Sequence, residues 1–141
     1  MTVLDRFLGV PTGAAEREAD LAERLADPSQ SIALFGSRIE QITNKSAALL
    51  QADSIFIAVA LYVIQMRRTD AAGEIALILL TASCLLLASN LWSVFPRRVS
   101  DGPDHQLRLM YDLRISRGIR FNLALYMFFV GVAVLALSAF I

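Results

Sequence analysis

The sequence predicts an all-α integral membrane protein with three transmembrane helices, a cytoplasmic N-terminal helical region and a cytoplasmic helix between the second and third spans. Three apolar segments lead to this fold class: Ser46–Met66, Ile75–Phe95 and Phe121–Ile141. Each has the roughly 20 residues that a helix needs to cross a hydrocarbon layer about 30 Å thick. Of the 141 residues, 56% are hydrophobic, which leaves little chain for a separate globular domain.

The basic residues predict the orientation of these spans. Eleven of the 13 lysines and arginines lie before the first span or between the second and third, and only Arg67 and Arg68 lie elsewhere. Because basic loops stay on the cytoplasmic side of a bacterial inner membrane, we expect a cytoplasmic N-terminus and a periplasmic C-terminus. The expected segments are a cytoplasmic region 1–45, spans 46–66, 75–95 and 121–141, and a basic cytoplasmic connection 96–120.

Composition argues against several classes of function. Basic and acidic residues number 13 each, so the net charge does not favour nucleic-acid binding. Cys84 is the only cysteine and His105 the only histidine, so neither a disulfide framework nor a metal-ligand set is expected. The sequence has no glycine-rich phosphate loop and no nucleophile elbow, and we therefore expect no enzyme and no cofactor.

The region before the first span is expected to be helical. Met1–Val10 is a short amphipathic piece, and Ala14–Ala26 has the composition of a solvated, charged helix. Asp27 and Pro28 then provide a helix start, with aspartate at the N-cap and proline at the first helical position. No proline follows before Met66, so the sequence predicts one helix through the cytoplasmic region and the first span.

Apolar residues along this long helix follow alternating three- and four-residue steps, which is typical of a coiled-coil seam. Before the membrane the seam consists of Ile32, Phe35, Ile39 and Ile42. It has two interpretations. The seam either joins identical subunits into a homo-oligomer, or packs on the chain's own cytoplasmic helix before the third span.

Asp53 is the most informative single residue, because an ionisable group within a span is unfavourable and usually faces the bundle interior or water. The polar turn 67–74 makes the first two spans an antiparallel hairpin, which puts Asp53 opposite Ala88–Asn90. The expected polar layer contains Gln51, Asp53, Ser89, Asn90, Asn122 and Tyr126. Asp53 has either a functional role or a structural one in this layer.

Small or polar residues also recur at every seventh position of each span, which allows helices to approach closely. These residues are Ser46, Asp53 and Ala60; Ala76, Ser83 and Asn90; and Ala124, Gly131 and Ser138.

The connection after the second span is expected to contain a helix that starts at Asp104 as N-cap and bends at Gly118. Basic residues near the expected membrane surface are Lys45, Arg97, Arg98, Arg114, Arg117 and Arg120. These residues have two interpretations. They form a binding site for an anion such as a nucleotide phosphate, or they set the topology of the chain and contact anionic lipid.

The start of the first span, Asn44–Lys45–Ser46–Ala47–Ala48–Leu49–Leu50, resembles that of the transmembrane effectors of bacterial Pycsar antiphage systems. Pro96–Arg97 and the helix before the third span are also similar, and the resemblance covers roughly Ser37–Ile141. It implies a homo-oligomeric inner-membrane effector of antiviral defence that responds to a cyclic pyrimidine nucleotide and impairs the membrane. The alternative is a non-catalytic accessory subunit of a larger membrane complex.

The charge distribution makes a topology prediction. A reporter fused after Ile141 is expected in the periplasm and one inserted at Gly102 in the cytoplasm, because basic residues flank the second of these sites. Reporter activity in living cells measures both. The reverse result would exclude the three-span arrangement.

Overall fold

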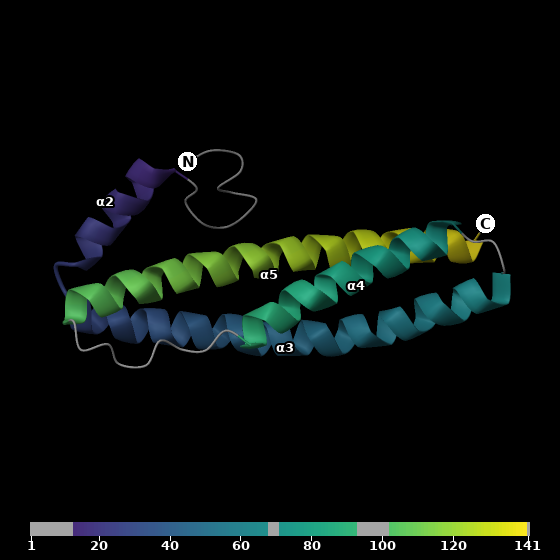
Figure 1. The fold of residues 1–141 in the computed structure, drawn as a ribbon, viewed down its shortest axis with the longest axis horizontal. Helices are drawn as coiled ribbons and strands as arrows, with labels where there is room; N and C mark the ends of the chain where they lie inside the picture. Colours follow the sequence, from purple (N-terminus) through teal and green to yellow (C-terminus); the bar gives the residue numbers. More distant parts are fainter. Residues whose placement is uncertain (1–12, 68–70, 93–101, 141) are drawn as a thin grey trace.

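The computed structural model describes residues 13–67, 71–92 and 102–140, which form four helices. They are α2 (Ala14–Arg24), α3 (Pro28–Arg67), α4 (Ala71–Trp92) and α5 (Pro103–Phe140). Figure 1 shows α3 and α5 running side by side along the molecule, with α4 beside one half of them and α2 diverging at the other end. The helices α3, α4 and α5 are long and apolar enough to cross a membrane, as predicted.

Two sections of the molecule follow from this arrangement. The proximal section comprises α2, residues 28–45 of α3 and residues 103–120 of α5. The membrane section comprises residues 46–67 of α3, all of α4 and residues 121–140 of α5. Met1–Val10, Arg97 and Arg98, to which the sequence assigned roles, lie outside the described residues.

The helix α3 is continuous, as the sequence predicts, and its start is capped by Asp27. The Asp27 Oδ1 atom accepts hydrogen bonds from the backbone N–H of Gln30, at 3.3 Å, and from the Ser29 hydroxyl, at 3.0 Å. An aspartate at this position binds N–H groups that have no partner in the first helical turn. The charged helix before it ends at Arg24 rather than at Ala26.

The bend predicted at Gly118 is wrong, because α5 is one helix of 38 residues. It starts at Pro103 and not after an Asp104 cap. Gly102 adopts a φ of +95°, which is accessible without strain only to a residue that lacks Cβ, and its carbonyl accepts the Gln106 N–H at 3.3 Å. The helix before the third span and the third span itself are therefore a single rod. The second span also starts earlier than predicted, at Ala71.

The coiled-coil seam of α3 packs within the chain. Phe35 and Ile39 are 0% exposed and form a buried cluster with α5, against which Ile32 packs in a partly buried position. The rings of Phe35 and Tyr111 lie 5.7 Å apart, and Ile42 is partly buried. The centre of the seam thus packs on α5 of the same chain, which is the second of the two interpretations that the sequence allowed.

The membrane section buries its small residues together with a few large apolar ones, such as Leu80 and Phe128, whereas other large apolar residues face outward. All nine residues of the seven-residue repeats, from Ser46 to Ser138, are buried. Large side chains point outward instead, such as Ile78 and Leu85, each 67% exposed, and Phe129, 60% exposed. This distribution suits a bilayer, where close packing of helix backbones and not apolar burial holds spans together.

The close approach at Gly131 makes a testable prediction. A Cβ atom added there would lie 3.0 Å from Cγ of Leu80, which is itself fully buried, and 3.4 Å from Cβ of Leu79. Gly131→Ala is expected to destabilise the protein by about 1 kcal/mol or more, because the packed helices must separate. The thermal midpoint of the detergent-solubilised protein measures this loss.

Gly36→Ala is the matched control. Its added methyl group would meet only Cε of Met110, at 3.9 Å, which is an ordinary contact. Alanine favours the helix by about 0.5–1 kcal/mol over glycine, so this variant is expected to be slightly more stable. Equal midpoints for the two variants would contradict the close packing at Gly131.

Candidate functional site

A cavity of about 220 Å³ lies between α2 and α5 in the proximal section. Its lining residues are Arg17, Glu18 and Leu21 of α2 and Arg108, Tyr111 and Asp112 of α5. Two guanidinium groups and two carboxylates thus share one small space. Such a set suits a ligand that carries both an anionic group and hydrogen-bond donors.

Tyr111 forms a buried wall of this cavity. Its side chain is 2% exposed, and its hydroxyl has no hydrogen-bond partner among the residues that the structure describes. Tyr111 lies before the third predicted span, and burial, followed by the nearby Asp20 carboxylate, raises the pKa of Tyr111 to about 12. The hydroxyl is therefore neutral at physiological pH and able to donate to a ligand.

Phe35 connects the three helices next to the cavity. The guanidinium carbons of Arg24 in α2 and Arg114 in α5 each lie 5.3 Å from the centroid of the Phe35 ring. Cations at this distance are attracted by the ring electrons. The Nε atom of Arg24 also donates to Asp20 Oδ1 at 3.0 Å, which reduces the repulsion between the two arginines. The position of α2 thus depends on the contact of Arg24 with Phe35 and on the packing of Leu21 against the same apolar cluster.

A polar layer, here called the junction layer, joins the three long helices where the two sections meet. The Nδ2 atom of Asn90 in α4 donates to Ser46 Oγ of α3, at 3.4 Å, and to the carbonyl of Arg117 in α5, at 3.3 Å. The Nη1 atom of Arg117 donates to Thr43 Oγ1 of α3 at 3.1 Å. Asn90 and Ser46 are 0% exposed and Arg117 is 2% exposed, so the junction layer is closed to solvent.

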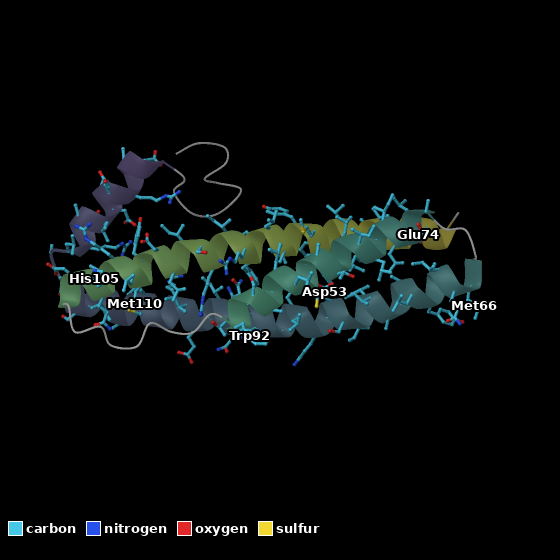
Figure 2. All side chains as sticks on the ribbon, in the orientation of Figure 1. Asp53, Met66, Glu74, Trp92, His105 and Met110 are labelled. Carbon is cyan, nitrogen blue, oxygen red and sulfur yellow. The ribbon has the colours of Figure 1, made fainter. Side chains whose placement is uncertain are left out.

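Asp53 lies in the next layer of the membrane section, beside Ser83 of α4. Figure 2 shows it near the middle of the long axis, between α3 and α4. It is 0% exposed, and neither carboxylate oxygen has a hydrogen-bond partner in the described part of the chain. The Ser83 hydroxyl instead donates to the Ala124 carbonyl of α5 at 3.0 Å.

The six residues predicted to form one polar layer lie at different places. Asn90 belongs to the junction layer and Asp53 to the next one. Gln51 is exposed, Ser89 and Asn122 are partly buried, and Tyr126 is 37% exposed. The prediction that Asp53 lies opposite Ala88–Asn90 assumes that the second span starts at Ile75. The helix α4 already starts at Ala71, and its register brings Asp53 to Ser83 instead.

The four basic residues that the structure describes, among those predicted to bind an anion, do not converge on one site. Lys45 is exposed, Arg114 lies over Phe35, Arg117 belongs to the junction layer and Arg120 is partly buried. The structure instead brings Arg17 and Arg108 to the cavity. The sequence prediction did not include Arg17 or Tyr111 in an anion site, because only the packing of α2 on α5 brings Arg17 to Tyr111 and Arg108.

The junction layer generates a stability prediction. Asn90→Ala removes both hydrogen bonds between helices and is expected to destabilise the protein by about 1–2 kcal/mol. Ser54→Ala is the control, since the exposed Ser54 hydroxyl donates to the Leu50 carbonyl one turn back in the same helix, at 2.8 Å. The thermal midpoint should fall clearly for Asn90→Ala and little for Ser54→Ala. An equal fall would mean that the junction layer does not hold the helices together.

Comparison of the chain with family models, with curated proteins and with solved structures finds no match. The cavity between α2 and α5, the junction layer and Asp53 are therefore interpreted from the chemistry of their own residues. Among these three features, the cavity alone combines charged groups of both signs with an accessible space.

Proposed function

We propose that this protein is a homo-oligomeric effector of a bacterial inner membrane, acting in antiviral defence, that impairs the membrane when a cytoplasmic ligand binds between α2 and α5. One observation carries the proposal: α5 is unbroken from the cavity wall at Arg108 and Tyr111 to the end of the third apolar segment. A continuous helix moves as a rigid rod, because each turn is hydrogen-bonded to the next. Ligand binding at one end can therefore displace the helix within the membrane.

The ligand class that we propose is a cyclic pyrimidine nucleotide, in keeping with the resemblance of the first span. The guanidinium groups of Arg17 and Arg108 would bind the cyclic phosphate. The carboxylates of Glu18 and Asp112 would accept hydrogen bonds from the base, and the Tyr111 hydroxyl would donate one. The proximal section would then lie in the cytoplasm, in agreement with the predicted topology.

Two sets of contacts would transmit a movement of α2 from the cavity to the membrane section. Arg24 and Arg114 share the Phe35 ring, so a shift of α2 changes the contacts of both α3 and α5. The junction layer then links both helices to α4 through Asn90. Because the centre of the α3 seam is buried within the chain, subunits of the oligomer would meet through their membrane sections.

Ligand binding tests this proposal directly. Arg108→Gln is expected to weaken binding of cyclic UMP or cyclic CMP about tenfold or more, since a charged hydrogen bond contributes about 1.5–3 kcal/mol. Titration calorimetry on the full-length protein in detergent measures the affinity. A potential-sensitive dye in cells should report depolarisation with the wild type and not with the variant.

Arg38→Gln is the control, because Arg38 is an exposed arginine of the proximal section that does not line the cavity. It should bind the nucleotide and depolarise cells as the wild type does. Cyclic AMP serves as the purine control. No binding of either pyrimidine nucleotide to the wild type would refute the proposed ligand.

A second candidate is a non-catalytic accessory subunit of a larger membrane complex. One observation favours it: Ile78, Leu85 and Trp92, at every seventh position of α4, are 67%, 67% and 87% exposed. A stripe of large apolar residues at this spacing could pack against the span of another protein. Purified protein that permeabilises lipid vesicles without a partner would exclude this candidate.

A further inference from the structure

The polar groups around Asp53 suit the protonated form of its carboxyl group better than the ionised form. An ionised carboxylate accepts hydrogen bonds, whereas a protonated carboxyl group also donates one. The Ser83 hydroxyl is the polar group beside Asp53, and its hydrogen is directed to the Ala124 carbonyl, which can only accept. The Ser83 hydroxyl can therefore accept a hydrogen bond from Asp53 but cannot donate one to it. This arrangement suits a protonated carboxyl group.

No cation among the described residues compensates a charge on Asp53. On α4, Cys84 is close enough to interact with Asp53 electrostatically, and a neutral thiol supplies no positive charge. On α5 the residue at this level is Ala124, and the nearest arginines towards the proximal section are Arg120 and Arg117. Arg117 belongs to the junction layer, about 10 Å along the helix axis from Ala124. Lys45 of α3 is exposed and lies still farther along the chain.

We propose that Asp53 is a proton-binding site of the membrane section: the packed three-helix bundle holds a proton on this carboxyl group, which donates to Ser83 Oγ. When the helices separate enough to admit water, the O–H bond breaks and the proton passes to water. The carboxylate that remains is then solvated and opposes repacking of the bundle. This inference does not depend on the ligand of the α2–α5 cavity, since it concerns the bundle alone.

Infrared spectroscopy of the full-length protein in lipid vesicles tests the proposal without any nucleotide. At pH 7, where exposed carboxyl groups are ionised, the wild type should show the carbonyl stretch of a protonated carboxylic acid. Asp53→Asn should lack this band. Asp104→Asn, which changes an exposed aspartate outside the cavity, should retain it. Labelling the wild type with carboxyl-¹³C aspartate should shift the band, which identifies an aspartate even if Asp53→Asn fails to fold.

Thermal unfolding provides a second readout. The packed bundle holds a proton at pH 7 that the unfolded chain releases, so the stability of the wild type should fall as the pH rises. Asp104→Asn should show the same slope of stability against pH, and Asp53→Asn should lose it.

Two results would overturn the assignment. The absence of the carboxylic-acid band from the wild type at pH 7 would mean that Asp53 is ionised in the packed bundle. Disappearance of the band when sodium replaces choline at constant pH would mean that the site binds a metal cation in place of the proton. Both spectra are recorded on the same vesicles, and the Asp53→Asn protein gives the baseline.

Discussion

The close approach of three helix backbones is the constraint on which the rest of this structure depends. In the membrane section the contact surfaces carry small or polar residues at every seventh position, and Gly131 lies so close to Leu80 that an added Cβ atom would be 3.0 Å from the Leu80 Cγ atom. Larger residues at these positions would separate the helices. In lipid, apolar burial contributes little to helix association, so this separation would remove the dispersion contacts that hold the spans together.

Tight packing also decides which polar groups can stay in the interior. At the junction layer, Asn90 reaches a hydroxyl of α3 and a carbonyl of α5, so its amide links all three helices. One layer deeper, the Ser83 hydroxyl is bonded to α5, and Asp53 meets no donor in the described part of the chain. The two layers have opposite consequences. The junction layer holds the helices together, whereas the helices stay packed around Asp53 only while its carboxyl group is neutral.

The proximal section is held by a different kind of contact. Its centre is the apolar cluster around Phe35 and Ile39, against which Leu21 of α2 packs, and Arg24 of α2 lies over the Phe35 ring. The ion pair between Arg24 and Asp20 lies within α2 and stabilises that helix without joining it to its neighbours. Partly exposed charged contacts are weaker than packed apolar ones and respond to added ions and ligands. The α2 helix, which lines the cavity with α5, is therefore held in part by contacts that a ligand can change.

By itself, the sequence determined the membrane class, the three long apolar helices, the start of α3 at Pro28 after the Asp27 cap, and the buried seven-residue repeats. These features follow from local composition, capping chemistry and periodicity, which act between residues close together in the chain. Only the tertiary structure decided that Asp53 lies beside Ser83, that the α3 seam faces α5, and that Tyr111 joins Arg17 at a cavity. Which residues of α3 and α4 lie opposite each other depends on the length of the turn between the two helices. A change of a few residues in that length changes the partner of every residue in the pair of helices. The partners of the seam and the cavity depend on contacts between distant segments, which local patterns do not specify.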